Sequence, residues 1–226
     1  MSELSEYLID GPSADTAQAT FLFAHGAGAG MDHAFMATLA EGLASHGIRV
    51  VRFDFPYMVK RREDGKKRPP DRQPKLLLDF QRHIEAFAAD GKLVIGGKSM
   101  GGRMASLMVT DLAAESPGVS NCRDRVKGVA CLGFPFHPPG KPENFRGDHL
   151  RDIAVPTLIL QGERDTFGTR AEVEGWSYAE TVQTAFLPDG DHSFKPRKAS
   201  GHTEAGNLAL AIAQLAAFIK ECVEDD

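Results

Sequence analysis

The sequence predicts an α/β protein built on a mostly parallel central sheet with helices on both faces. Short apolar runs alternate along the chain with longer segments of helical periodicity, the pattern of strand–helix–strand units. Several runs are almost entirely apolar, as expected for strands covered on both faces. The 226 residues contain no internal repeat and no Ser/Gly-rich linker. We therefore expect one domain spanning 1–226.

The apolar runs and the periodic segments place the individual elements. Strands are expected at Thr20–Ala24, Ile48–Phe53, Lys92–Ile95, Val126–Leu132, Pro156–Leu160 and Val182–Leu187. Helices are expected at His33–His46, Pro74–Ala89, Met100–Ala114, Thr169–Trp176 and Glu204–Cys222. In the last helix, Leu208, Ile212, Leu215 and Ile219 share one face. Alternation of this kind favours parallel strands joined by crossover helices.

Two segments stand apart from this alternation. Lys60–Arg72 is strongly basic and has no apolar residue, so we expect a solvated loop. Phe134–Pro142 is rich in Pro and Gly and follows the expected strand that ends at Leu132. Both segments follow the carboxyl end of a strand, where open α/β sheets place their sites.

Composition narrows the classes of partner. The formal net charge is −5, so the molecule as a whole is not expected to bind nucleic acid. The first residues lack the features of a secretory signal, and no uninterrupted apolar stretch is long enough to cross a membrane. Three cysteines without a CxxC pair suggest neither a metal site nor a disulfide framework. We expect a cytoplasmic protein; its oligomeric state is left open.

The segment Leu93–Arg103 carries the strongest chemical motif. Gly97-Lys98-Ser99-Met100-Gly101 matches G-x-S-x-G between an apolar strand and a helical segment. Such a turn puts Ser99 at its apex and at a helix N-terminus, where a developing oxyanion is stabilised. The alternative is a tight packing turn or a phosphate loop. The spacing G-x-x-x-x-G-K-[ST] is missing ahead of the helix, which disfavours a phosphate loop.

A nucleophilic serine needs a base and a residue that orients the base. Asp165 follows the strand Pro156–Leu160, and His192 follows the strand Val182–Leu187, in the chain order Ser, Asp, His. Asp189 and Asp191 are alternatives for orienting the imidazole, and Glu163 is a weaker one. His202 is a rival for His192 but is not next to a strand end.

An oxyanion hole needs two N–H donors. The residue after the serine, Met100, supplies one. The strand Thr20–Ala24 runs into His25-Gly26-Ala27-Gly28, a loop that resembles the second donor loop of hydrolases, and we assign that donor to Ala27. Its glycines are not spaced as G-x-G-x-x-G, which disfavours a dinucleotide site. His25 is expected to brace the loop.

Together these motifs resemble one family. FLFAHGAGAG, GGKSMGGR, LILQGERDTFG and DGDHSF are similar to small bacterial α/β-hydrolases related to dienelactone hydrolases and to the α/β-hydrolase-like domains of an animal testis-expressed protein and an NSL-complex subunit. The resemblance runs from about His25 to His192. It implies an α/β-hydrolase fold without a large cap domain and a triad of Ser99, Asp165 and His192. Thr166 departs from the proline expected after the aspartate.

The sequence thus predicts a serine hydrolase acting on a small ester, thioester or lactone, without a metal or other cofactor. A small serine peptidase and a non-catalytic scaffold of the same fold remain alternatives. Phe136 and His137 are candidates for the pocket wall. Arg61, Arg62 and Arg103 are candidates for binding an anionic substrate, because 60–72 holds seven basic against three acidic residues. A solvated loop without a ligand is the alternative.

Overall fold

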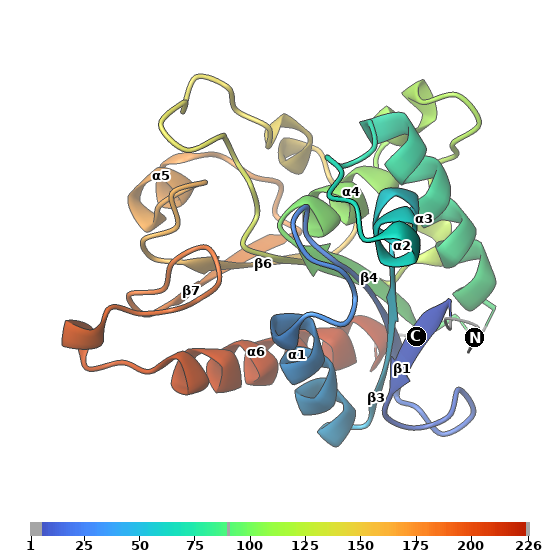
Figure 1. Ribbon diagram of the computed structural model, residues 1–226, viewed down its shortest axis with the longest axis horizontal. Coiled ribbons are helices and arrows are strands. Elements are labelled where there is room, and N and C mark those ends of the chain that lie inside the picture. Colours follow the sequence, from blue (N-terminus) through green and yellow to red (C-terminus); the bar gives the residue numbers. More distant parts are fainter. Residues whose placement is uncertain (1–5, 90, 225–226) are drawn as a thin grey trace.

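The computed structural model describes residues 6–89 and 91–224, and these form one twisted seven-stranded sheet with helices on both faces (Figure 1). The strand order is β1-β3-β2-β4-β5-β6-β7. The bounds are β1 Tyr7–Asp10, β2 Ala19–Ala24, β3 Ile48–Phe53, β4 Leu93–Lys98, β5 Gly128–Leu132, β6 Thr157–Gly162 and β7 Val182–Leu187. Strand β1 pairs antiparallel with β3, and the other pairs are parallel. The predicted fold class is confirmed.

The strand order creates a switch point between β2 and β4. From β2 the chain moves outward to β3 and then crosses to the other side of β2 to form β4. Ala24 of β2 is paired with Gly97 of β4, so the two strands end at the same level. The loops that follow them therefore meet at the carboxyl edge, the usual place of a site in open α/β sheets.

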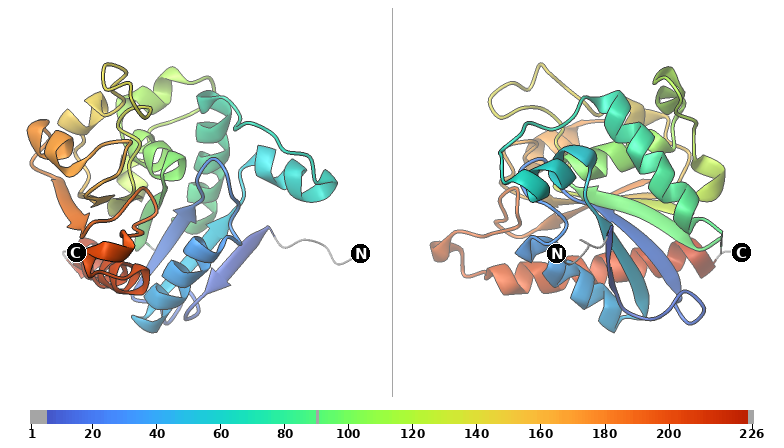
Figure 2. Two further views of the ribbon diagram at one scale, coloured as in Figure 1. Left: turned by 60° about the vertical axis from the view of Figure 1, so that its left-hand side comes forward. Right: turned by 45° about the vertical axis from the view of Figure 1, so that its right-hand side comes forward.

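Helices cover both faces of the sheet (Figures 1 and 2). On one face lie α1 (Ala34–Ser45) and α6 (Glu204–Glu224). On the other lie α3 (Gln73–Phe87) and α4 (Met100–Met108), with α2 (Pro56–Asp64) and α5 (Arg170–Gly175) at the carboxyl edge.

Alternation along the buried strands divides the core into two layers. Leu22 and Ile95 face α3 and α4, whereas Phe21 and Val94 face α1 and α6. Among the described residues, α6 is the one helix long and apolar enough to cross a membrane by length and composition. It buries Leu215 and Ile219 against the sheet.

Two expectations about elements were wrong. Lys60–Arg72 is not all loop, because α2 continues to Asp64 and ends at Gly65, whose φ of 71° closes the helix. Only Tyr57 and Met58 of α2 are buried, so the helix has almost no apolar signal.

The helix expected over Met100–Ala114 ends at Met108, and a separate 3₁₀ turn covers Asp111–Glu115. Both the backbone N–H and the hydroxyl of Thr110 donate to the Leu107 carbonyl, and such local bonds compete with the continuation of a helix. Strand β1 was not predicted, since four residues at a partly exposed edge carry little hydrophobic pattern.

Candidate active site

Ser99 lies at the sharp turn between β4 and α4. Its backbone is strained, with φ 51° and ψ −114°, a conformation that non-glycine residues adopt mainly at functional sites. The turn is possible because no side chain intrudes: a Cβ on Gly101 would lie 2.6 Å from the carbonyl oxygen of Ala24, and one on Gly97 would collide with Gly101. The glycines of the motif are therefore required by packing between α4 and β2.

The structure brings Ser99, His192 and Asp165 together from three different loops. Nε2 of His192 lies 2.8 Å from the Ser99 hydroxyl, and Nδ1 lies 2.8 Å from Oδ2 of Asp165. Because a carboxylate only accepts hydrogen bonds, Nδ1 carries the proton. The Nε2 lone pair is thus directed at the hydroxyl of Ser99.

Asp165 is held in place by groups other than the imidazole. It is fully buried; Oδ1 accepts from the Phe167 N–H at 2.9 Å, and Oδ2 accepts from Nε2 of Gln161 at 2.9 Å. The Gln161 amide is also buried and is bound on both sides by the Phe134 backbone. The Phe167 ring lies over the imidazole, with centroids 4.3 Å apart. Carboxylate and ring therefore have one available orientation each.

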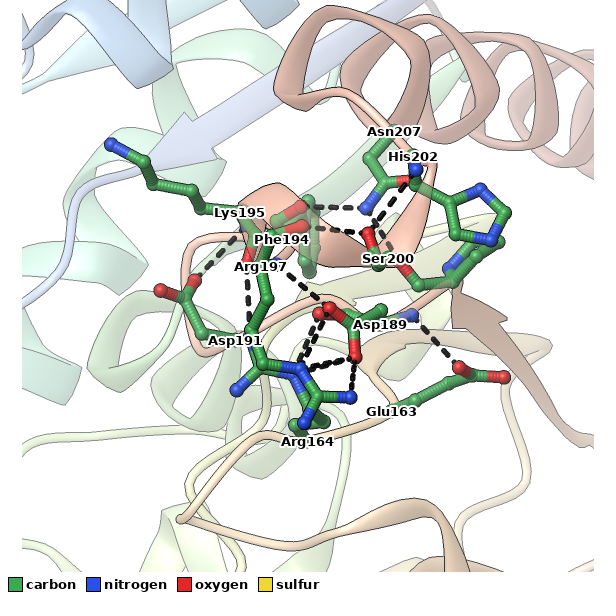
Figure 3. A network of polar contacts seen from close by, with 11 residues as sticks. Glu163, Arg164, Asp189, Asp191, Phe194, Lys195, Arg197, Ser200, His202 and Asn207 are labelled. Carbon is green, nitrogen blue, oxygen red and sulfur yellow. Dashed lines mark hydrogen bonds and ion pairs between the residues drawn. The ribbon is translucent and has the colours of Figure 1, made fainter.

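The loop that carries His192 is braced by a separate polar network (Figure 3). Asp189 accepts from the Arg197 backbone and guanidinium and pairs with Arg164 at 3.0 Å. Asp191 accepts from the N–H groups of Ser193 and Lys195. Both rival carboxylates thus stabilise the loop, and Asp165 is the one that contacts the imidazole.

The loop after β2 is fixed through its carbonyl groups. The Gly26 carbonyl accepts from Nδ1 of His25 at 2.6 Å, and the Tyr57 hydroxyl lies 3.0 Å from the Ala27 carbonyl oxygen and 3.2 Å from that of Gly26. In a trans peptide the following N–H points the opposite way, so the Ala27 N–H points away from Tyr57. His25 accepts from the Phe55 N–H through Nε2, and burial lowers the pKa of His25, which keeps the ring neutral. His25 braces this loop.

A pocket of about 370 Å³ opens beside Ser99. It is lined by Ser99, His192, Ser193, Phe167, Lys98, the loop Gly26–Ala29, His33, Phe35 and Met36. The rim is mixed: aromatic and methionine side chains supply an apolar wall, and the loop exposes backbone groups. Such a space suits a small organic substrate.

Lys98 is a pocket residue that the sequence motif did not indicate. Its side chain is buried, Nζ donates to the backbone carbonyl of His192, and Nζ lies 5.6 Å from the centroid of Phe35. Burial lowers the pKa of Lys98 to about 8. The ammonium thus links β4 to the His192 loop at a cost in desolvation.

This desolvation predicts the effect of Lys98→Met on stability. An unfolded lysine titrates near 10.4, so between about pH 8 and pH 10 the unfolded chain binds more protons and the free energy of unfolding rises with pH. Below pH 8 the buried ammonium destabilises the folded state by up to about 3 kcal/mol. Lys98→Met should raise Tm at pH 7, remove the rise between pH 8 and 10, and lower kcat by loosening the His192 loop. Lys66→Met, at an exposed lysine, should show none of these three changes. Thermal melts across this pH range would contradict the account if both variants followed the wild type.

Two candidates for the pocket wall are corrected by the structure. Phe136 is fully buried and packs on Phe134, Phe145 and Trp176. His137 is also buried, and its Nδ1 donates to the Pro138 carbonyl. Neither lines the pocket at Ser99. The segment turns inward because its aromatic side chains complete the core beneath α5.

The three arginine candidates lie in different surroundings. Arg61 donates to the Gly28 carbonyl at 3.0 Å, and Arg62 pairs with Asp54 at 2.6 Å and with Asp32 at 3.4 Å. Both line a hollow that shares Gly28, Ala29 and His33 with the pocket. Arg103 is on α4, one turn after Ser99, and donates to Gln73.

A mostly parallel sheet with a strained serine at the turn after a central strand defines an α/β-hydrolase. The sequence agrees, since it matches the alpha/beta hydrolase domain family over residues 17–220. The chain belongs to this family.

Solved structures share the fold. A serine hydrolase homologue from Coxiella burnetii is 19% identical, with a TM-score of 0.63, 93% of this chain and 89% of that chain being covered. Est1E from Butyrivibrio proteoclasticus, with ferulic acid bound, is 17% identical, with a TM-score of 0.65 and coverage of 97% and 95%. Dienelactone hydrolase from Anabaena variabilis is 21% identical, with a TM-score of 0.61 and coverage of 94% and 89%. At these identities the likeness is one of fold.

Proposed function

We propose that the protein is a serine hydrolase that cleaves a small ester, thioester or lactone through an acyl-enzyme intermediate. One observation carries the proposal: an unbroken line of hydrogen bonds runs from Asp165 through His192 to the Ser99 hydroxyl, with both contacts at 2.8 Å. The hydroxyl faces a pocket, so a substrate carbonyl has access to it.

The first half of the reaction transfers the acyl group to the enzyme. Ser99 Oγ attacks the carbonyl carbon while its proton passes to Nε2 of His192. Asp165 stabilises the resulting imidazolium without taking its proton. The bond to the leaving group then breaks, and His192 returns the proton to the departing oxygen or sulfur.

The second half releases the acid. Water attacks the acyl carbon, gives one proton to His192, and Ser99 leaves with that proton. In both halves the negative charge on the carbonyl oxygen is held by the N–H groups of Ala27 and Met100. Donors that are fixed before the reaction are worth about 10²–10³-fold in rate each. The bracing of the Gly26 carbonyl described above supports this role for Ala27.

The size of the pocket supports a small substrate. A space of about 370 Å³ holds a short acyl or aromatic group, not an extended polymer segment. Est1E was solved with ferulic acid, and another neighbour is a dienelactone hydrolase; these names are compatible with an ester or lactone as the substrate here. The strain at Ser99 also favours a catalytic protein over an inert scaffold, because unused strain only costs stability.

A substrate panel tests this proposal. We expect the wild type to hydrolyse 4-nitrophenyl esters and thioesters of short acyl chains, and Ser99→Ala to lose this activity. Ser120→Ala, at an exposed serine on another loop, is the matched control and should retain it. Activity that survives in Ser99→Ala would contradict the proposal.

A further inference from the structure

Arg103 occupies an unusual position next to the nucleophile. Its backbone N–H donates to the Ser99 carbonyl at 3.1 Å, so Arg103 lies one helical turn after the turn that carries Ser99. Nη1 donates to Oε1 of Gln73 at 3.0 Å, and the buried Nε has no hydrogen-bond partner. The guanidinium is half-buried and is balanced only by a neutral amide.

A second guanidinium increases the positive charge at this place. Arg146 lies in the segment after β5, where its N–H donates to the Phe136 carbonyl at 2.7 Å. Burial and the nearby Arg146 charge lower the pKa of Arg103. The buried His149 offers no compensation, because burial and Arg103 lower its pKa to about 4 and leave it neutral. Within 6–89 and 91–224, no carboxylate pairs with either arginine.

The arginines of α2 provide the contrast. Arg62 is neutralised by Asp54 and Asp32, so its charge stabilises the protein without any ligand. Arg103, in contrast, is half-buried and is matched by no carboxylate among the described residues, and the charge of the exposed Arg146 acts against it. An unpaired charge that is removed from water destabilises the protein unless a group of opposite charge neutralises it. A planar guanidinium is also the side chain best suited to bind an oxyanion with two hydrogen bonds.

We propose that Arg103 and Arg146 form an oxyanion subsite, so that the substrate is an ester whose far end carries a carboxylate or a phosphate. This inference rests on the proposed function. The pocket lined by Lys98 and Phe35 is on the β2-loop side of Ser99, whereas Arg103 contacts the N-terminus of α3. One half of the ester occupies the pocket, and the other half extends past Met100 to the two guanidinium groups. A rise of 1.5 Å per residue places Arg103 about 6 Å along α4 from Ser99, a length that about four to six atoms between the scissile carbonyl and the anionic group can span.

Two matched esters test the subsite. Mono-4-nitrophenyl adipate and 4-nitrophenyl hexanoate have equal acyl chain lengths and differ in the terminal carboxylate. We expect the wild type to favour the adipate in kcat/KM, and Arg103→Gln and Arg146→Gln each to reduce that preference about tenfold. Arg146 is exposed, so its substitution leaves the fold intact. Arg49 lies near the amino end of β3, away from the carboxyl edge that carries Ser99. Arg49→Gln also removes one positive charge and should keep the preference.

A binding measurement separates this inference from the proposed function. Calorimetric titration of Ser99→Ala with adipate and with inorganic phosphate needs no turnover. The anion with the lower Kd shows whether the subsite prefers a carboxylate or a phosphate. If the Kd of that anion is at least tenfold higher for Ser99→Ala/Arg103→Gln than for Ser99→Ala, the subsite is supported even if neither ester is hydrolysed. The subsite is overturned if neither anion binds, or if the preference for adipate is the same in the wild type and both arginine variants.

Discussion

Replacing His192 with alanine is expected to lower kcat by about 10⁴-fold or more, the size of loss seen when the base of a serine triad is removed. The reason is that Nε2, 2.8 Å from Ser99 Oγ, is the group placed to take the hydroxyl proton. Without it, a neutral serine hydroxyl must attack the carbonyl. Steady-state kinetics on the best 4-nitrophenyl ester measures the loss.

His202→Ala is the matched control for this variant. His202 is an exposed histidine ten residues further along the chain, and its backbone N–H donates to the Ser200 hydroxyl. Its replacement should leave kcat within a few-fold of the wild type. A His192→Ala variant with near-normal kcat, or a His202→Ala variant with the larger loss, would show that the base has been assigned to the wrong residue.

Asp165→Asn is expected to lower kcat by about 10⁴-fold although it changes only one side-chain atom. An asparagine can donate a hydrogen bond to Nδ1 of His192, which moves the ring proton to Nε2. The imidazole would then donate toward Ser99, and no base would be available. The fold should be retained with a lower Tm, because the Phe167 N–H still finds an acceptor in the amide oxygen, whereas Nε2 of Gln161 loses its acceptor at Oδ2 and faces the new amide NH2.

Asp189→Asn separates the two kinds of carboxylate near His192. Asp189 pairs with Arg197 and Arg164 and not with the imidazole, so its substitution should lower Tm more than kcat. The orienting role of Asp165 would be refuted if Asp189→Asn caused the larger loss of turnover. Thermal melts and single-substrate kinetics on both variants make the comparison.

The sequence was sufficient for the main sheet and for the three side chains at its edge. Six strands were predicted from short apolar runs, and five of them are buried along nearly their whole length, whereas β7 is only partly buried. Ser99, Asp165 and His192 could be found because each lies within five residues of the end of a strand, and parallel strands bring their carboxyl ends to one edge. The family resemblance is confirmed by the match over 17–220.

Other parts of the site carried no pattern in the sequence. Lys98 is one of the two variable residues of G-x-S-x-G, and Gln161 is a single polar residue at a strand end, so only the tertiary structure shows their contacts with His192 and Asp165. Arg146 comes from a loop whose path depends on the burial of Phe136. The Pro-rich segment before it was wrongly expected to face the pocket, because proline content indicates a rigid loop and not the direction of its side chains.

The central claim is that Ser99 is the nucleophile, and covalent labelling tests it most directly. A fluorophosphonate probe should react with the wild-type protein, and mass spectrometry of the digested protein should find the adduct on the peptide that contains Ser99. Ser99→Ala should remain unlabelled, while Ser120→Ala should be labelled as the wild type is. An adduct on another residue, or no adduct on a folded protein that hydrolyses esters, would contradict the account.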